Sequence, residues 1–260
     1  MRHKSLMAIG IIGLSAINVM TSAHAQTNQI NWSGFYAGGS LGAIDGRASF
    51  DAATADDFSG SYFSSPDADQ IASESDNSLS QSKLTAGLFG GFGKQYNHWY
   101  LGIETNINSF DFDETTTSGA VYESNPVSEF RHEMTVKSDW QAMLRSRVGW
   151  AERNWLAYLT AGVAVSRFSL DASFSDDLLA GAAGHDSESE TKFGWVVGLG
   201  GEYALSENWS IRGEYLYADY GKVDTNAAVN NASFPVLSNN LKSSVDLKTQ
   251  ILSLGVSYRF

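Results

Sequence analysis

The sequence predicts an all-β protein, an eight-stranded antiparallel up-and-down transmembrane β-barrel. Eight stretches alternate apolar and polar residues with period two, and the joints between them are alternately short and long. Aromatic residues gather in two belts whose separation matches the apolar band of a membrane barrel. Three prolines and 25 glycines among 260 residues, with 12% aromatic residues, are typical of a chain with many strands.

The first 25 residues have the composition of an export signal. Basic residues precede a mostly apolar run over 6–20, and the sequence Ala-His-Ala at 23–25 supplies the small-x-small pattern of a signal-peptidase site. We expect 1–25 to be a signal peptide and 26–260 to be one barrel domain. Nothing later in the chain approaches 18 uninterrupted apolar residues, so we expect no membrane-spanning helix.

Composition excludes several other classes of protein. The chain has no cysteine, which rules out disulfides, thiolate metal sites and a lipid-modified amino-terminal cysteine. Removal of Arg2 and Lys4 with the leader takes the formal net charge from −12 to −14. An excess of acidic residues disfavours nucleic acid as a partner.

The predicted strands follow one another as a meander. They cover 34–44, 82–94, 98–110, 135–150, 155–169, 190–204, 208–220 and 246–260. The joints 95–97, 151–154 and 205–207 have hairpin length, whereas 45–81, 111–134, 170–189 and 221–245 read as long loops. The first and last strands must pair if the barrel closes.

The two faces of these strands differ in kind. One face is apolar, with residues such as Leu101, Ile103 and Ile107, and the other interleaves glycine with charge. Glycine weakens an exposed strand but suits the crowded interior of a narrow barrel, so we expect the apolar face to meet lipid. The predicted lumen charges are Glu104, Arg145, Arg147, Glu202, Arg212 and Glu214. An ion-pair network that fills the lumen is favoured over a charged constriction that selects solutes.

The aromatic belts test this assignment independently. The belt nearest the short turns and the termini comprises Trp32, Trp99, Trp150, Trp155, Tyr203, Trp209, Tyr258 and Phe260. On the same face, Trp140 lies ten residues from Trp150, and Trp195 lies eight from Tyr203. Strands tilted by about 40° cover about 20–25 Å over such spans, which is the height of the apolar band of an outer-membrane barrel.

Four stretches carry a family resemblance. They are WSGFYAGGSLG at 32–42, LRSRVGWAERNWLAYLTAGVA at 144–164, GWVVGLGGEYALSENWSIRGEYLYADYG at 194–221 and LGVSYRF at 254–260. Together they resemble the small outer-membrane β-barrel, opacity-like or porin-family proteins of Gram-negative bacteria. The resemblance implies a barrel in the cell outer membrane, in contact with its lipid and lipopolysaccharide. It also implies insertion by the barrel-assembly machinery, with the terminal Phe260 as assembly signal.

Candidates for chemistry are few. The mature histidines are His98, beside a short turn, and His132 and His185, in long joints, and none accompanies a serine in a paired pattern. We therefore expect no enzyme activity, no catalytic residue, and no cofactor or metal site. Haem capture would draw its axial ligands from His132, His185, Tyr62 and Tyr122.

Charge is concentrated in three of the long joints. There are eight acidic residues in 45–81, six in 111–134 and five in 170–189, with one arginine in each of the first two. Solvation of an exposed surface explains such acids, and cations bridging to lipopolysaccharide or a basic host or matrix ligand are alternatives. The sequence favours a structural, envelope-integrity and surface-interaction role. The alternatives are a narrow porin-like channel for small solutes and a loop-mediated adhesin or haem-binding receptor.

Overall fold

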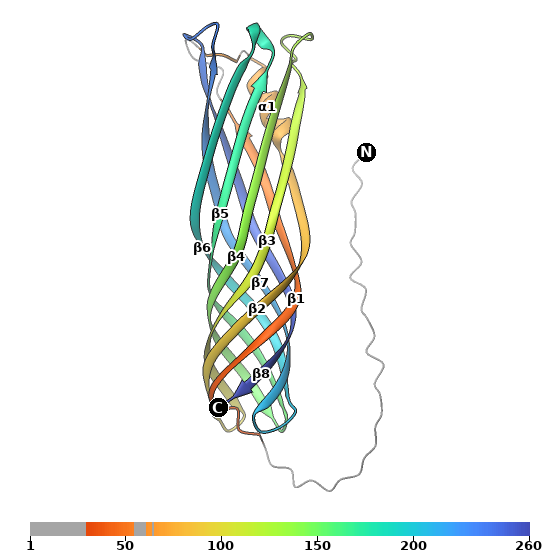
Figure 1. Ribbon diagram of the computed structural model, residues 1–260, viewed down its shortest axis with the longest axis vertical. Helices are drawn as coiled ribbons and strands as arrows, with labels where there is room; N and C mark the ends of the chain where they lie inside the picture. The colour runs from red at the N-terminus through yellow and green to blue at the C-terminus, as the bar shows by residue number, and fades with distance from the viewer. Residues whose placement is uncertain (1–29, 55–60, 64) are drawn as a thin grey trace, which may run out of the picture.

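The computed structural model describes residues 30–54, 61–63 and 65–260, and it contains a closed barrel of eight antiparallel strands (Figure 1). Strand order around the barrel follows the chain, which confirms the predicted meander. The signal peptide and its cleavage site lie outside the described residues and stay a prediction. The strands are β1 (Gly34–Ala53), β2 (Asn77–Tyr96), β3 (Trp99–Val121), β4 (Glu129–Glu152), β5 (Trp155–Asp176), β6 (Ala182–Ala204), β7 (Trp209–Asn231) and β8 (Ser238–Arg259).

Closure is made by β1 and β8, as expected for the first and last strands. Their register runs from Tyr36↔Arg259 near the chain end to Ala53↔Lys242 at the opposite end. The last residue adds one bond, because the Phe260 N–H donates to the Phe35 carbonyl at 3.0 Å. A closed barrel leaves no sheet edge in hydrocarbon, where an unpaired backbone group costs several kcal/mol.

The short turns lie at the end that holds the carboxyl terminus (Figure 1). They join β2 to β3, β4 to β5 and β6 to β7, at the predicted positions. Asn97 and Arg153 adopt φ values of 55° and 52° in the first two turns, a left-handed conformation that tight hairpins require.

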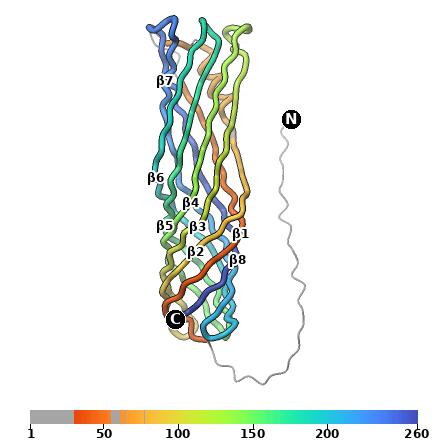
Figure 2. The backbone as a smooth tube through the Cα atoms, in the orientation of Figure 1, coloured from red at the N-terminus to blue at the C-terminus, as the bar shows by residue number. Residues whose placement is uncertain are grey.

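The strands are much longer than predicted, and this corrects the assignment of the four long loops. Most of each predicted loop is paired strand, so the barrel continues as a tall extension beyond the predicted strands (Figure 2). The connections at that end are 54–76, 122–128, 177–181 and 232–237, and they hold a helix α1 (Asp67–Ser75) and a 3-10 turn η1 (Leu178–Ala180).

A reversal of polarity along each strand explains the error. In β1 odd-numbered residues face outward throughout, but outward Leu41 gives way to outward Arg47, while inward Gly42 gives way to inward Ile44 and Phe50. The lower barrel is apolar outside and polar inside, and the extension is the reverse. A strand assignment that follows outward apolar residues therefore ends where the lower barrel meets the extension, although the strands continue past this point.

Register shifts adjust the strands near this boundary, one of them between Ser109 and Phe112 in the pairing of β3 with β4. Asp139 and Trp140 are successive exposed residues in β4, where the pairing with β5 shifts between Lys137 and Gln141. In β7 the pairing with β8 shifts between Asp219 and Gly221, and Gly221 has φ 68°. An extra residue in the left-handed conformation is the usual way to insert such a bulge, and glycine adopts it without strain.

Two seams interrupt the ladder in the extension. The β2–β3 pairs run from Tyr96↔Trp99 up to Gly87↔Asn108, and above them Thr85 Oγ1 donates to the Ser109 carbonyl at 2.6 Å. The β6–β7 pairing is interrupted between Ala183 and Trp195. Side chains therefore bridge neighbouring strands where the backbone ladder stops. No helix in the described part of the chain is long and apolar enough to cross a membrane.

Candidate functional site in the barrel lumen

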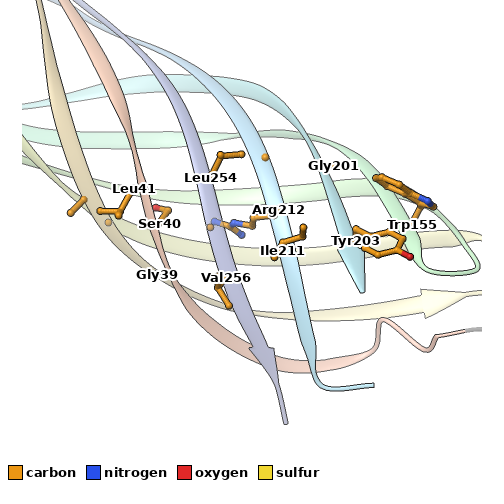
Figure 3. Close-up of a pocket in the computed structure, with 14 residues that line it drawn as sticks. Gly39, Ser40, Leu41, Trp155, Gly201, Tyr203, Ile211, Arg212, Leu254 and Val256 are labelled. Carbon is orange, nitrogen blue, oxygen red and sulfur yellow. The ribbon is translucent and has the colours of Figure 1, made fainter. Parts of the chain in front are cut away.

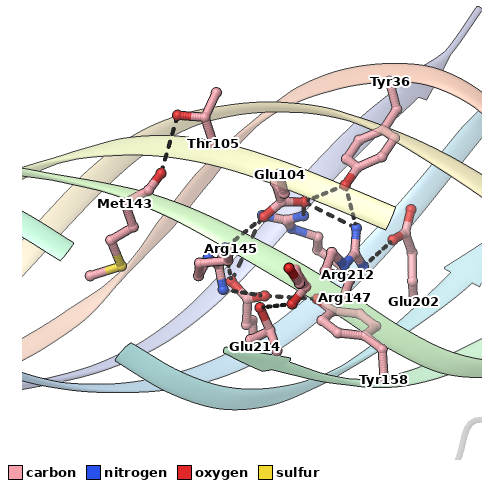
Figure 4. Close-up of polar contacts among 12 residues, drawn as sticks. Tyr36, Glu104, Thr105, Met143, Arg145, Arg147, Tyr158, Glu202, Arg212 and Glu214 are labelled. Carbon is pink, nitrogen blue, oxygen red and sulfur yellow. Dashed lines mark hydrogen bonds and ion pairs between the residues drawn. The ribbon is translucent and has the colours of Figure 1, made fainter. Parts of the chain in front are cut away.

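The six predicted lumen charges meet inside the lower barrel (Figure 4). Glu104 comes from β3, Arg145 and Arg147 from β4, Glu202 from β6, and Arg212 and Glu214 from β7, and all six are buried. Cross-strand register sets one of the ion pairs directly, because Glu104 lies opposite Arg145. Glu202 lies opposite Arg212, but its ion pair is with Arg147.

Glu104 is the centre of this charge cluster. Its carboxylate accepts from Arg145 at 2.6 Å, from Arg147 at 3.0 Å and from Arg212 at 2.7 Å. A second carboxylate, Glu214, accepts two bonds from Arg145 at 3.0 and 3.1 Å. Arg147 also donates to Glu202 at 3.2 Å. Three arginines thus balance three glutamates, which is what burial of charge requires.

Tyrosines complete the cluster, and sequence reasoning missed them. The Tyr36 hydroxyl accepts from Arg147 and donates to Glu104, each at 2.9 Å, and the Tyr158 hydroxyl donates to Glu214 at 3.0 Å. The signal was available in the register, because Tyr36 pairs with Gly91 and Tyr158 pairs with Gly200.

These glycines make room for the rings. A Cβ at Gly91 would lie 2.5 Å from the Tyr36 hydroxyl oxygen, and one at Gly200 would lie 2.4 Å from Tyr158 Cζ. The Arg147 guanidinium carbon in turn stands 3.7 Å from the centre of the Tyr158 ring, within cation–π range. The inward glycines of the sequence therefore serve the packing of this cluster.

Above the charge cluster the lumen becomes apolar. Gln141 accepts from the Tyr220 hydroxyl at 2.7 Å and from Thr249 Oγ1 at 3.4 Å, forming a polar layer at the transition. Beyond it, a buried cluster fills the inside of the extension. Its members include Ile44, Phe50, Phe110, Phe112, Met134, Phe168, Leu170, Val245 and Leu247.

The far end of the lumen is filled by the chain's own β1–β2 connection. We call residues 61–63 and 65–75, which include α1, the plug. Tyr62, Phe63 and Ile71 of the plug are buried in an apolar cluster with residues of the surrounding strands, and the rings of Phe63 and Phe174 are 5.5 Å apart. Figure 1 shows α1 beside the upper parts of the strands, toward the end opposite the carboxyl terminus.

Polar contacts hold the plug at Tyr62 and within α1. The Tyr62 N–H donates to Asn239 Oδ1 at 3.2 Å, and the Tyr62 hydroxyl donates to Asp176 at 2.9 Å. Gln70 of α1 donates to the Val121 carbonyl at 2.7 Å and accepts from the Glu123 N–H at 2.9 Å.

Two titratable groups in the extension have shifted pKa values. His132 of β4 is 1% exposed, and burial lowers its pKa to about 4. Its Nδ1 lies 3.3 Å from Ser75 Oγ of the plug, and its Nε2 lies 3.4 Å from Ser243 Oγ of β8. Burial raises the pKa of Asp176, although its hydrogen bonds with Tyr122, the Ala182 N–H and Tyr62 oppose that rise.

Trp32 is not in the aromatic belt, which corrects one of the predicted interface residues. Its side chain is 2% exposed and packs in a cluster at the short-turn end of the lumen. The Arg259 guanidinium lies 4.5 Å from its ring, and the backbone N–H of Trp32 donates to Gln95 Oε1 at 2.9 Å. Trp32 precedes β1, so strand parity does not govern its direction, and it closes the bottom of the barrel.

Comparison with known proteins decides the family. Residues 11–260 match the family model described as outer membrane protein beta-barrel domain. The chain belongs to this family. It is therefore an outer-membrane β-barrel protein, and both the resemblance read from the sequence and the predicted location are confirmed.

Individual relatives agree with this assignment. A 31 kDa outer-membrane immunogenic protein of Brucella melitensis is 29% identical over 260 residues, covering 98% of this chain and 94% of the relative. A 22 kDa outer membrane protein of Rhizobium leguminosarum bv. viciae is 27% identical over 161 residues, covering 62% and 64%. Solved structures with lower similarity include Ail, the attachment invasion locus protein of Yersinia pestis. That match has 14% identity, a TM-score of 0.37, and covers 88% of this chain and 100% of Ail.

As an outer-membrane barrel, the chain presents its exposed apolar band to lipid. Leu101, Ile103 and Ile107 are all about half exposed, and Leu254 is 74% exposed. These exposures would be costly in water, and they are normal for a surface in contact with hydrocarbon.

The remaining predicted belt residues all lie on the outer surface. Trp99 and Trp150 are 5.4 Å apart between ring centres, Trp155 and Tyr203 are 4.7 Å apart, and Trp209 and Tyr258 are 5.0 Å apart. Phe260, Trp140 and Trp195 are exposed as well. Their role at the membrane interface stays a prediction. Phe35, Tyr96 and Phe193 are further exposed aromatics that the sequence reading left out.

The candidate haem ligands are not brought together. His132 is buried inside β4, whereas His185 is exposed on β6. The hydroxyls of Tyr62 and Tyr122 both donate to Asp176, at 2.9 and 2.7 Å. The expectation that all four are loop residues is wrong for the two histidines, because the predicted loops are strands.

Proposed function

We propose that this protein is a closed, non-conducting barrel that holds a tall extension above the outer membrane for envelope integrity and surface interaction. The observation that carries the proposal is that side chains fill the lumen along its length. The charge cluster, the apolar cluster and the plug occupy successive levels.

The charge cluster supports a structural role over a solute-selecting one. Arg145 and Glu104 each have side chains with 0% exposure. Both terminal nitrogens of Arg145 and both carboxylate oxygens of Glu104 form bonds within the cluster. An eight-stranded barrel is only just wide enough for its own side chains. A solute would have to displace ion pairs whose separation in the interior costs several kcal/mol.

The extension supports a role at the cell surface. Past Ser109, β3 runs about a dozen more residues, which gives roughly 30 Å of height in a tilted strand. Paired strands hold this height as a rigid wall, because each strand is bonded to at least one neighbour. The name of the Brucella relatives, outer-membrane immunogenic protein, is compatible with an exposed surface of this kind.

Charge on the extension differs from the acidic loops expected from sequence. Asp111 and Asp113 of β3, Glu129 and Glu133 of β4 and Asp171 of β5 lie on strands rather than in loops. Several acids already have basic neighbours, since Lys137 pairs with Asp113 and Arg131 pairs with Glu133, each at 3.3 Å. We propose that the remaining acids contact cations of the lipopolysaccharide layer or a basic ligand at the surface.

Conductance in planar bilayers tests closure. Folded wild-type protein should give no stepwise current. Currents that change in Arg145→Gln or Glu104→Gln protein would assign a narrow channel and overturn the proposal.

Orientation and display are tested on intact cells. The chain has no cysteine, so a single introduced cysteine is a unique label. A membrane-impermeant maleimide should label Thr115→Cys, which is exposed in the extension, and should leave Asn97→Cys in a short turn unlabelled until the cells are opened. The reverse pattern would place the extension in the periplasm. Loss of detergent resistance in a deletion strain, restored by the wild-type gene, tests the envelope role.

A further inference from the structure

A groove crosses the lipid-facing wall of the lower barrel. It has a volume of about 1050 Å³, and leucine, isoleucine, valine, aromatic and glycine residues line most of it (Figure 3). Gly213 of β7 and Gly201 of β6 line it and pair with each other, and the lining continues through Leu254 of β8 and Leu41 of β1. Ala157 of β5 pairs with Gly201 and continues this row of small residues beyond the groove's lining. All three share the outward face of the wall.

Larger side chains stand on both sides of this row of small residues. The row two residues toward the extension consists of Tyr215, Leu199 and Leu159, which are in register with one another and stand next to the residues that line the groove. The row two residues toward the short turns consists of Ile211, Tyr203 and Trp155. The two rows are four residues apart along each strand, or roughly 13 Å between backbones, which leaves a slot about one hydrocarbon chain wide between their side chains.

The floor glycines have no explanation within the protein. A Cβ at Gly201 would meet no atom within 4 Å, and one at Gly213 would meet only Leu254 Cδ2 at 3.6 Å. Gly200, one residue away but directed inward, is different, because the Tyr158 ring occupies the space beside it. Glycine within a strand costs roughly 0.5–1 kcal/mol relative to alanine. No packing contact within the protein explains this cost at Gly201 and Gly213, because the space beside both residues lies outside the barrel and is open.

The position of the groove indicates what occupies it. The wall belongs to an outer-membrane barrel, so lipid hydrocarbon surrounds the groove. Trp155 and Tyr203 lie beside the short turns, at the level where aromatic side chains meet headgroups. Arg153, in the turn that leads into Trp155, is exposed and forms no ion pair with any described residue. The positive charge of Arg153 at the short-turn end of the groove is complementary to the negative charge of a lipid phosphate.

We propose that this groove is a binding site for one acyl chain of a phospholipid of the periplasmic leaflet, with the phosphate near Arg153. A second barrel would present a convex wall, which enters a slot of this width only through single side chains. A flexible acyl chain can follow the slot along its whole length. The inference goes beyond the proposed function, and it rests only on the placement of this wall in the membrane.

Groove-filling variants test the site. Gly201→Val and Gly213→Val, separately and together, place a side chain on the floor, and Ala161→Val adds bulk to an exposed position on β5 outside the groove. Native mass spectrometry in a mild detergent measures palmitoyl-oleoyl phosphatidylethanolamine retained per barrel. Wild type and Ala161→Val should retain one lipid at equal occupancy, and the double groove variant should lose roughly tenfold in affinity. Equal retention by all three proteins would overturn the proposal.

Two further readouts keep the result decisive. A wild-type dimer that disappears in the groove variants would assign the groove to self-association instead. The second readout uses chain-brominated phosphatidylethanolamine and needs no groove variant. The emission of Trp155, taken as the difference between wild type and Trp155→Phe, should be quenched at low lipid ratio and reach saturation. Quenching of Trp155 that merely parallels that of Trp195, in the other belt, would show ordinary solvation by lipid and overturn the site.

Discussion

Arg145 donates two parallel hydrogen bonds to Glu214, from Nη1 to Oε1 at 3.0 Å and from Nη2 to Oε2 at 3.1 Å. The two side chains are 0% and 3% exposed, and they come from strands on different sides of the barrel. A fork of this kind fixes both position and orientation across the lumen. It also leaves each partner dependent on the other, since an unpaired charge cannot be hydrated at this depth.

Removal of one partner should therefore be costly. Arg145→Ala leaves Glu104 and Glu214 short of a buried cation, and the free energy of unfolding should fall by about 3–5 kcal/mol. Urea unfolding in lipid vesicles, followed by the heat-modifiable shift in electrophoresis, measures the change. Lys137→Ala removes an exposed ion pair with Asp113 and should cost no more than about 1 kcal/mol. Equal effects of both variants would contradict a buried structural network.

Adjacent glycines should respond oppositely to alanine. Gly200→Ala forces a methyl group against the Tyr158 ring, 2.4 Å from Cζ, and should destabilise the barrel by about 1–3 kcal/mol. Gly201→Ala meets nothing within 4 Å and should be neutral or stabilise by up to about 1 kcal/mol. Unfolding midpoints of the two variants check the prediction, which fails if Gly201→Ala is the more harmful.

Arginine substitutions on the apolar band test whether the outward face of the lower barrel contacts lipid. Leu144→Arg and Leu254→Arg each place a cation against hydrocarbon, and each should cost roughly 2–4 kcal/mol of barrel stability if near the bilayer midplane. Thr115→Arg, exposed in the extension, should change stability little. Vesicle unfolding experiments compare the three. Normal stability of both leucine variants would mean that this wall does not face lipid.

Protonation of His132 should lower the stability of the extension and its plug in acid. Its folded pKa of about 4 lies below the usual 6.5, so the unfolded or opened state binds more protons between these values. Stability from this residue is full above pH 6.5 and falls as pH drops toward 4, by at most about 3 kcal/mol. Asp176 has the opposite sign, because its pKa is raised and its contribution is lost as pH rises. Hydrogen exchange of the plug, compared between wild type and His132→Gln, isolates the histidine. Identical pH profiles would sink the prediction.

Deletion of Phe260 should separate assembly from stability. Its side chain is 76% exposed and its backbone adds a single bond to Phe35, so the folded barrel should lose little. The family resemblance implies that the assembly machinery recognises the terminal aromatic, so we expect the amount of protein reaching the outer membrane to drop several-fold. Phe35→Ala, on a neighbour that is 66% exposed, is the matched control and should assemble normally. Equal surface levels of the truncated protein would refute the signal.

The sequence predicted the membrane-level barrel well because its two faces differ in chemistry there. Period two alone places Glu104 and Arg145 on the inward face of their strands and Leu144 on the outward face. The extension was missed because Ile44 and Phe50 occupy the parity that holds Gly42 below, so apolar residues change faces within one strand.

The plug and Trp32 lay beyond strand patterns for a different reason. Tyr62 and Ile71 sit in a connection, where no periodicity fixes direction, and their burial depends on β4, β5 and β8, which are distant in sequence. Trp32 precedes β1 and turns inward because the bottom of the lumen is open to it. The buried sites that these residues occupy exist only once the barrel has closed, so the local sequence could not reveal them.

The reversal of polarity along continuous strands also sets how deep the molecule sits. A slip outward would lift Leu41 and its neighbours into water, and a slip inward would drive Arg47 and its neighbours into hydrocarbon. Because all the strands are bonded into one closed wall, they cannot adjust separately, and the penalties add around the circumference. The sequence of the strands therefore sets the depth of the barrel in the membrane, and it fixes the height of the extension above the apolar band in the same way.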